Sequence, residues 1–248
     1  MLIGLLSDPH ANLPAVEAVL TDVETAAPDV LVCLGDFVGY GAQPNEVVEA
    51  LRDRCSVCLA GNHDLAALGR LDVAAFNPFA AASVAWTADH LAGETERFLA
   101  GLGSRTQFEG IDLAHASLRD PVNEYVFDEE IAQANFDADP FEVAVVGHTH
   151  VPRLFVQAGE QVLAYQIEEG LATDPTGGGL LGKIRLLINP GSIGQPRDGD
   201  PRASWGIWDT EGRSLRLRRV WYDVEQAQSS IRAAGLPDLL ADRLAAGW

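Results

Sequence analysis

The sequence predicts an α/β protein with a parallel sheet formed by its first half and a second sheet packed against it. The first observation is the alternation of short apolar runs with helical segments over residues 2–64, which is typical of βαβ units. The second is a set of hairpin-like strands between residues 153 and 221, which indicates antiparallel pairing. The third is a globular composition, with 47% hydrophobic residues in 248, enough for a sizeable core.

The first half of the chain supplies the parallel strands. Residues 2–6 are apolar without polar alternation, as expected for a buried strand. Asn12 is placed to cap the following helix, which has a proline in its first turn and apolar residues at helical spacing. Two further buried strands are predicted over 30–34 and 57–60, with a helix that opens near Pro44 between them.

The middle of the chain changes its pattern. Residues 65–102 are Ala-rich and have a helical period, so we expect a helical cap or insertion there. His90 falls on one of these helices and away from any strand end, which favours a structural or solvated side chain over a metal ligand. A hairpin around Gly110, a short helix over 129–135 and a buried strand over 143–146 are expected to follow.

The second half is predicted to be mainly antiparallel. Its expected elements are a hairpin of 153–157 with 161–165, a Gly-rich loop over 174–182, strands over 184–188, 204–208 and 215–221, and two helices within 225–244 that are divided at Gly235-Leu236-Pro237. No internal repeat or low-complexity linker is visible. We therefore expect residues 1–248 to form a single domain.

Charge and composition exclude several classes of protein. The formal net charge is −19 and the 17 Lys and Arg residues are scattered, so a nucleic-acid partner is not expected. No apolar run approaches the ~20 residues that span a bilayer, and no basic signal-peptide segment begins the chain. Three cysteines with a single Cys-x-x-Cys fit small core residues better than a zinc site. These features predict a cytoplasmic protein without a membrane partner. They leave the oligomeric state open and allow a homo-oligomer.

Polar side chains gather where the predicted strands end. Five segments, each after a short apolar run, contain five of the six histidines. Because ligands of open α/β sheets bind at the carboxyl ends of the strands, we expect these segments to form one metal site. The candidate ligands are Asp8, His10, Asp36, Asn62, His115, His148 and His150.

The ligand types and their number indicate two ions. Carboxylate, imidazole and amide donors together suit borderline divalent ions, of which we expect Mn²⁺ first and Fe, Ni or Zn as alternatives. Ca²⁺ and Mg²⁺ prefer shells of oxygen alone. The set exceeds the shell of one ion and fits two ions that share a bridging carboxylate. Two ions about 4 Å apart provide hydroxide near neutral pH and neutralise a phosphate ester. The pattern therefore predicts phosphoryl-transfer chemistry.

These motifs resemble the calcineurin-like metallophosphoesterase superfamily. The set Asp8-x-His10, Gly35-Asp36, Gly61-Asn62-His63-Asp64, His115 and Gly147-His148-x-His150 is similar in order and spacing from residue 3 to about 150. Residues 189–197, Gly39-Tyr40-Gly41 and Val220-Trp221-Tyr222-Asp223 resemble small bacterial members that are often described as phosphodiesterases. The resemblance implies two stacked mixed β-sheets flanked by helices, a four-layer α/β/β/α sandwich.

The resemblance also implies a role for each residue. Asp8, His10 and His150 would bind the first ion, Asn62, His115 and His148 would bind the second, and Asp36 would bridge them. His63 would contact the scissile phosphate and protonate the leaving oxygen, oriented by Asp64, while a bridging hydroxide attacks in line.

Several residues close to the motifs could have either a substrate-binding role or a purely structural one. Asn12 and Arg197 are candidate substrate-binding residues, but Asn12 could serve only as a helix cap. Arg197 and Arg202 either clamp phosphate or pair with Asp198 and Asp200. Tyr40 and Phe37 either stack on a base or pack the loop.

Three residues depart from the family pattern. Pro9 removes an amide donor, and Ala11 and Ala116 stand where glycine is frequent. We expect Ala11 to disfavour a positive φ, which puts the geometry and the metal preference of the site in question.

The leading hypothesis is a metal-dependent phosphodiesterase that acts on small or nucleotide-like phosphate esters. The first alternative is a phosphomonoesterase, including a protein serine/threonine phosphatase or a dinucleoside polyphosphate hydrolase. The second, from another class, is a non-catalytic binding module that keeps the fold. The complete ligand set favours an enzyme.

Overall fold

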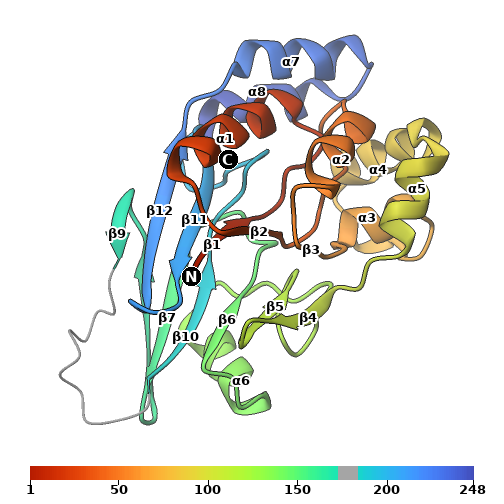
Figure 1. Ribbon diagram of the computed structural model, residues 1–248. Coiled ribbons are helices and arrows are strands. Elements are labelled where there is room, and N and C mark those ends of the chain that lie inside the picture. Colours follow the sequence, from red (N-terminus) through yellow and green to blue (C-terminus); the bar gives the residue numbers. More distant parts are fainter. Residues whose placement is uncertain (173–183) are drawn as a thin grey trace.

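The computed structural model describes residues 1–172 and 184–248, and its strands form two six-stranded mixed sheets (Figure 1). The first sheet has the order β3 (Val57–Cys58), β2 (Val30–Cys33), β1 (Leu2–Leu6), β11 (Ala203–Asp209), β12 (Ser214–Val220) and β9 (Gly170–Ala172). The second has the order β4 (Arg105–Phe108), β5 (Ile111–Ala114), β6 (Val143–Val145), β10 (Ile184–Asn189), β7 (Arg153–Ala158) and β8 (Gln161–Gln166). The predicted Gly-rich loop over 174–182 lies outside the described residues.

Helices cover both outer faces of the pair of sheets. They are α1 (Leu13–Ala26), α2 (Pro44–Arg52), α3 (Asn62–Ala67), α4 (Pro78–His90), α5 (Gly93–Ala100), α6 (Glu129–Ala138), α7 (Val224–Ala233) and α8 (Asp238–Ala246), with a 3-10 turn at Val73–Ala75. Figure 1 places α1, α7 and α8 beside the first sheet and α6 beside the second. The predicted α/β/β/α sandwich of two mixed sheets flanked by helices is confirmed.

Three clusters of apolar side chains fill the spaces between the layers. The helices pack on the first sheet through residues such as Val16, Val19 and Trp205. The space between the two sheets is filled by Leu5, Val32, Leu113, Ile188 and others from both sheets. The outer face of the second sheet packs on α6 through Phe136, Phe141 and Phe155. Burial on both faces explains why the central strands are apolar without alternation.

The assignment of strands to sheets differs from the sequence prediction. We expected the late strands to form the second sheet, but β11 pairs antiparallel with β1, Leu5 opposite Gly206, and so joins the first sheet. Conversely β5 and β6, which precede it in the chain, belong to the second sheet. The reason is that β11 is apolar on both faces, since Trp205 faces the helices and Trp208 faces the other sheet. Such a strand is stable only in the middle of a covered sheet.

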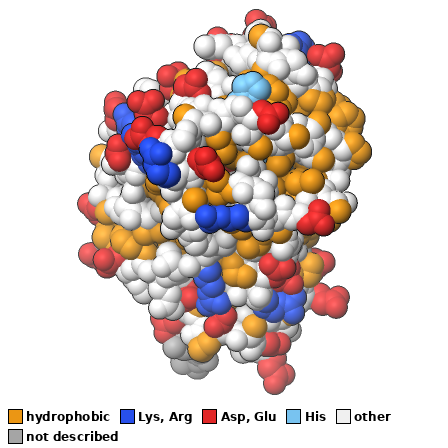
Figure 2. Space-filling view, turned by 90° about the vertical axis from the view of Figure 1, so that its right-hand side faces the viewer, with side chains coloured by type: hydrophobic (Ala, Val, Ile, Leu, Met, Phe, Trp, Pro, Cys, Tyr) orange, Lys and Arg blue, Asp and Glu red, His pale blue; other side chains and the backbone are white. Residues whose placement is uncertain are grey.

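The local elements match the prediction closely. The hairpins around Gly110 and Gly159 form, β1 and β2 pair in parallel, and α7 and α8 are separated by Gly235-Leu236-Pro237. The segment 65–102 is mostly helical, as predicted. Figure 2 shows the face to which α3, α4 and α5 contribute, where apolar side chains gather among scattered charges. Phe79 of α4, for example, is 42% exposed.

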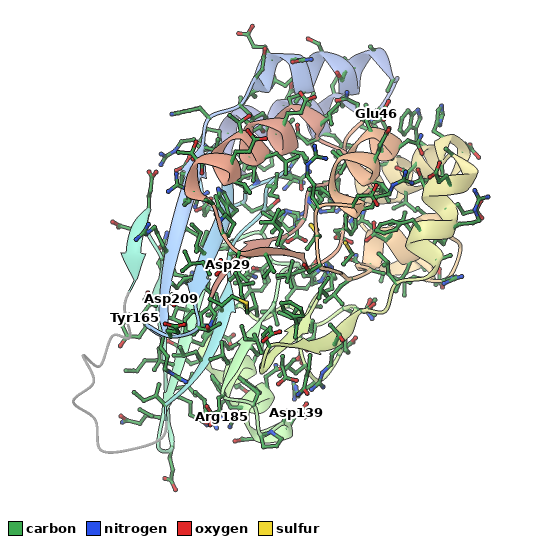
Figure 3. The ribbon with its side chains drawn as sticks, viewed as in Figure 1. Asp29, Glu46, Asp139, Tyr165, Arg185 and Asp209 are labelled. Carbon is green, nitrogen blue, oxygen red and sulfur yellow. The ribbon has the colours of Figure 1, made fainter. Side chains whose placement is uncertain are left out.

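Side-chain hydrogen bonds tie the second sheet to α6. Figure 3 shows Arg185 of β10 close to Asp139, just past the end of α6. The guanidinium of Arg185 donates to the backbone oxygens of Phe136, Asp139 and Phe141. The oxygen of Phe136 lies in the last turn of α6, where carbonyl groups have no intrahelical partner, and the arginine satisfies it together with two oxygens of the segment that follows the helix.

No helix within the described residues is long and apolar enough to cross a membrane.

Candidate metal centre

The predicted ligands lie on loops at the carboxyl ends of strands from both sheets. Asp8 and His10 follow β1 and Asp36 follows β2 in the first sheet, while His115 follows β5 and His148 and His150 follow β6 in the second. Asn62 is the first residue of α3, just after β3. The packing of one sheet on the other therefore brings together side chains that are up to 142 positions apart, as for Asp8 and His150.

The loops hold several of these residues in the left-handed region. The φ angles are 51° at Asp8, 44° at His10, 54° at Asp36, 67° at His148 and 61° at His150. Such angles cost about 1–2 kcal/mol for a residue with a Cβ, so the surroundings have to enforce them. Backbone bonds from Asp8 N to Gly35 O (3.1 Å) and from His10 N to Asp36 O (2.9 Å) join the first two loops. Strain of this kind is typical of functional sites.

The side chains converge in two groups that share one carboxylate. Asp8, His10, Asp36 and His150 form the first group, and Asp36, His115 and His148 form the second. Within each group the candidate ligand atoms lie within 4.8 Å of one another, and all are buried. Asn62 Oδ1 lies 3.2 Å from His115 Nε2 and so adjoins the second group. Asp36 is therefore the carboxylate that the two groups have in common.

The ring orientations of the histidines fit metal ligation. His10, His115 and His150 place Nδ1 at 2.7–2.9 Å from the backbone oxygens of Val38, Leu34 and Gln195. A carbonyl oxygen can only accept, so Nδ1 carries the hydrogen and Nε2 presents a lone pair. His10 Nε2 and His150 Nε2 lie 3.1 Å apart, which places two lone pairs face to face. His148 Nε2 is buried and has no hydrogen-bond partner among the described residues. A cation would satisfy all of these atoms.

Burial shifts the pKa values of the candidate ligands toward their neutral forms. It raises the pKa of Asp8 to about 7, and burial together with nearby Asp64 raises the pKa of Asp36 well above its usual range. It also lowers the pKa of His10, His148 and His150 well below 6.5. The imidazoles are therefore neutral, and the contact of 3.4 Å between His10 Nε2 and Asp36 Oδ2 is not an ion pair. Divalent ions would compensate the buried carboxylates, so the donor set fits the predicted ions.

Two glycines allow the carboxylates to reach their positions. A Cβ at Gly61 would lie 2.1 Å from Asp36 Oδ1, and a Cβ at Gly147 would lie 2.0 Å from Ser7 Oγ. Ser7 in turn donates to Asp8 Oδ2 over 2.5 Å. Both glycines belong to the predicted motifs, whereas the support from Ser7 was not anticipated.

His63 lies beside the cluster, but Asp64 does not orient it. The backbone amide of His63 donates to Asp36 Oδ1 (2.9 Å), and its buried Nδ1 has no partner among the described residues. The Asp64 carboxylate instead accepts from the amides of Val38 (3.1 Å) and Gly61 (2.9 Å). The expected contact between Asp64 and the His63 ring is therefore wrong. Asp64 is the third residue of α3 and folds back over the helix N-terminus, where free amides attract a carboxylate.

Both polar atoms of the Asn12 side chain form hydrogen bonds with the backbone. Its Oδ1 accepts from Ala15 N at the start of α1 (3.3 Å), and its Nδ2 donates to Gly194 O (2.8 Å). The helix-cap interpretation is thus confirmed, and a role in substrate binding stays a prediction.

The two arginines of the following loop behave differently. Arg202 Nη2 bonds Asp200 Oδ2 over 2.7 Å, as the ion-pair interpretation expected. Arg197 pairs with no carboxylate in the described part of the chain, and its Nη2 donates to Gln195 Oε1 over 2.8 Å. Arg197 also lowers the pKa of His63 and His150 after the larger effect of burial, which places its charge close to the cluster.

The departures from the family pattern leave the loops intact. Ala11 adopts φ 49° despite its Cβ, so the expectation that it would avoid a positive φ is wrong. Its amide donates to Phe37 O over 2.8 Å, which holds the conformation. Pro9 lies between two residues that both keep their bonds to the Asp36 loop. Ala116 is not among the residues with positive φ, so alanine costs nothing there.

A cavity of about 340 Å³ opens beside the second group of ligands. It combines amide, imidazole and aromatic side chains, and the main ones are Tyr40, Asn62, His63, Phe76, Asn123, Tyr125 and His148. Tyr125 was not anticipated by the sequence analysis, although Tyr125-x-Phe127 in a polar loop is a signal that could have found it. Phe37, in contrast, is fully buried and packs on Phe98, so it belongs to the core.

Comparisons with known proteins agree with this geometry. A family model described as "Calcineurin-like phosphoesterase superfamily domain" matches residues 1–213. An uncharacterised protein of Methanocaldococcus jannaschii is 35% identical over 252 residues, covering 99% of this chain and 98% of that protein. The crystal structure of a metallophosphoesterase from Sphaerobacter thermophilus is similar with 39% identity and a TM-score of 0.86, covering 100% of this chain and 99% of that one. A hypothetical protein from Pyrococcus horikoshii OT3 has the same fold with 19% identity and a TM-score of 0.78, covering 100% and 98% of the two chains.

Proposed function

The chain belongs to the calcineurin-like phosphoesterase superfamily, and we propose that it is a two-metal phosphodiesterase acting on small or nucleotide-like phosphate esters. The observation that carries the proposal is the pair of ligand groups that share Asp36, with a partly aromatic cavity directly beside them. A carboxylate common to two groups is the arrangement that a pair of ions needs.

The residues would divide into two shells around the shared carboxylate. Asp8, His10 and His150 would hold one ion and Asn62, His115 and His148 the other, with Mn²⁺ expected first and Fe, Ni or Zn as alternatives. When bound, two such ions supply Lewis acidity that activates water and neutralises charge on a phosphate ester. The carbonyls of Val38, Leu34 and Gln195 accept from Nδ1 of His10, His115 and His150, which leaves Nε2 of each ring free to bind an ion.

His63 is the proposed proton donor to the leaving oxygen. Its ring lines the cavity next to Asn62, and the ring centroid of Tyr40 lies 4.4 Å away. The assignment rests on this position, because a general acid has to reach the leaving group before its pKa matters. The rings of Tyr40, Phe76 and His10 around it fix its orientation in place of Asp64.

The cavity supports an ester that carries a flat group. Phe76 and Tyr125 are both in its lining, together with the amides of Asn77 and Asn123. Aromatic rings stack on a base or an aryl group, and amides can bond its edge. A cavity of about 340 Å³ is small for a protein substrate, which is why we rank a protein phosphatase below a diesterase for small molecules.

The first test is the metal content of the purified protein with its turnover of bis-p-nitrophenyl phosphate before and after Mn²⁺ addition. We expect about two ions per chain and hydrolysis that depends on them. One ion or none, without turnover over several divalent ions, would instead support the non-catalytic binding module.

Two further measurements separate the enzymatic alternatives. The ratio of rates on aryl phosphate diesters and monoesters distinguishes a diesterase from a monoesterase. His63→Ala should slow diesters with poor leaving groups more than activated aryl diesters, because only the former need a proton on the leaving oxygen. An equal loss on both would remove His63 as the acid.

A further inference from the structure

The C-terminal helix α8 brings a second arginine to the edge of the candidate site. It lies beyond residues 1–213, where the family match ends. Its apolar side packs on Tyr40 in a cluster that includes Leu240, Ala241 and Leu244. The same helix carries Arg243, whose guanidinium carbon lies 5.9 Å from the centroid of the Tyr40 ring. The guanidinium carbon of Arg197 lies 5.5 Å from that centroid.

Among the described residues, neither guanidinium has a side-chain carboxylate as its hydrogen-bond acceptor. Arg197 donates from Nε and Nη2 to Gln195 Oε1, and Arg243 donates from Nε to the backbone oxygen of Trp248. Within residues 1–172 and 184–248, neither pairs with a side-chain carboxylate, although the sequence has 36 acidic residues. The nearby basic residues Arg202 and Arg219 are paired, with Asp200 and Asp198 respectively.

The two charges are close enough to repel each other. Burial, and after it the charge of Arg197, lower the pKa of Arg243 to about 10. Like charges held together in a partly buried place are destabilising unless an anion lies between or beside them. Arginine is also the residue that binds phosphate oxygens in a bidentate way.

The pair adjoins the metal centre without belonging to it. The Tyr40 ring lies close to both guanidiniums and also to the rings of His10 and His63, whose centroids lie 4.7 and 4.4 Å from its own. Arg197 N donates to His150 O (3.2 Å), so the loop that carries Arg197 is fixed to a ligand loop. Gln195, which holds Arg197, is 1% exposed, and its Nε2 has no partner in the described part of the structure. This is a further donor beside the pair.

We propose that Arg197 and Arg243 form a second anion subsite, which binds an additional phosphate group of the substrate. The inference rests on the proposed function and narrows its substrate class to phosphate esters that carry a second phosphate. The ester phosphate would lie at the shared carboxylate, and the additional phosphate would lie on the α8 side of Tyr40. Because α8 is outside the part matched by the family model, this preference would be a property of chains that keep the C-terminal helices.

The test compares two probes that differ by one phosphate. We would measure by calorimetry the Kd of adenosine 5′-monophosphate and of adenosine 3′,5′-bisphosphate for the purified full chain. The wild type is expected to bind the bisphosphate about tenfold more tightly, the effect of one good charged contact. Arg243→Gln should reduce this preference to about twofold or less.

A matched variant controls for loss of positive charge. Arg232→Gln removes an arginine from α7 whose partners are Asp238 and Asp242 and whose side chain is 43% exposed. It should keep the tenfold preference. Should Arg243→Gln fail to fold, Arg197→Gln is expected to show the same loss. A wild type without preference, or a preference that survives both substitutions, would overturn the subsite.

The outcome separates this inference from the proposed function. Metal-dependent hydrolysis of bis-p-nitrophenyl phosphate without a preference for the bisphosphate leaves the hydrolase standing and removes the subsite. A preference that depends on Arg243, in a protein without hydrolysis, supports the subsite and removes the hydrolase.

Discussion

Tyr125 stacks on His148, with 3.9 Å between the ring centroids and 29° between the ring planes. Tyr125 is 40% exposed, whereas His148 is buried at 3%. The tyrosine therefore covers a predicted metal ligand and offers its own edge and outer surface to the cavity. The Phe127 ring lies nearly parallel to the Tyr125 ring, with 5.3 Å between the centroids.

Removal of this ring should weaken binding of an aromatic substrate. We expect Tyr125→Ala to raise the KM for an aryl or nucleotide ester about tenfold, since stacking on one base contributes about 1–3 kcal/mol. Steady-state kinetics would measure it. Tyr165→Ala is the matched control, because Tyr165 has a similar exposure of 37% and lies on β8 (Figure 3). An equal change in both variants would contradict a role for Tyr125 in the cavity.

Loss of one imidazole should remove one ion. His150 belongs to the first ligand group only, so His150→Ala should lower the metal content from about two ions to about one per chain. Elemental analysis after dialysis would show this. His90→Ala should leave the content unchanged, because His90 stacks on Trp86 at 4.0 Å on α4 and lies outside both groups. Two ions retained by His150→Ala would contradict the assignment.

A methyl group at Gly39 should displace His63. Its Cβ would lie 2.4 Å from His63 Nδ1, at a φ of +85°. We expect Gly39→Ala to lower kcat/KM on a diester with a poor leaving group by about 100-fold, because a displacement of a catalytic group by about 1 Å has an effect of this size.

Gly110→Ala provides the control for backbone strain. Gly110 has a similar φ of +77° but nothing within 4 Å of its Cβ. Both variants should lose about 1 kcal/mol of stability, and only Gly39→Ala should lose activity. Equal activity of the two would show that the position of His63 does not matter.

Glycine at position 11 should stabilise the protein. Ala11 has φ 49°, a conformation that glycine adopts without the Cβ penalty. We expect Ala11→Gly to increase the free energy of unfolding by about 1 kcal/mol in urea denaturation, against the usual direction. Ala15→Gly, inside α1, should lower it by about the same amount. A loss in both variants would mean that the Ala11 Cβ contributes more packing than strain.

One ion pair outside the site, between Asp22 and Arg218, should make the free energy of unfolding depend on pH. Hydrogen bonds from Arg218 hold the pKa of Asp22 below its usual 3.8, and Trp205 Nε1 also donates to it over 3.0 Å. A lowered pKa means that the carboxylate stabilises the fold above about pH 4 and that this contribution is lost as the pH falls through the folded value.

We therefore expect Asp22→Asn to cost about 1 kcal/mol at pH 7 and almost nothing near pH 2. Denaturant titrations at several pH values would measure the difference. Glu17→Gln, an exposed residue of the same helix, should cost little at either pH. A cost for Asp22→Asn that does not change with pH would contradict the ion pair.

The sequence was most informative where local pattern and strand ends coincide. The strands that deliver Asp8, Asp36, His115 and His148 are short apolar runs, and the residue after such a run is recognisable without a structure. The helix at residues 13–26 was equally predictable, because a cap, a proline and an apolar stripe agree. The orientation of His63 was not predictable, since it depends on Phe76 and Tyr40 from other elements.

By itself the sequence determined which residue types end the strands, and hence the family, the candidate ligands and the expectation of two ions. Only the tertiary structure decided which strands share a sheet, that Asp64 caps α3 instead of orienting His63, and that Arg243 lies next to Arg197 over Tyr40. The physical reason is the distance along the chain between the residues that interact. Strand ends, caps and turns depend on interactions between near neighbours in the chain. Sheet order and the neighbours of a side chain depend on contacts between segments that are as distant in sequence as Tyr40 and Arg243. No local sequence pattern predicts such contacts.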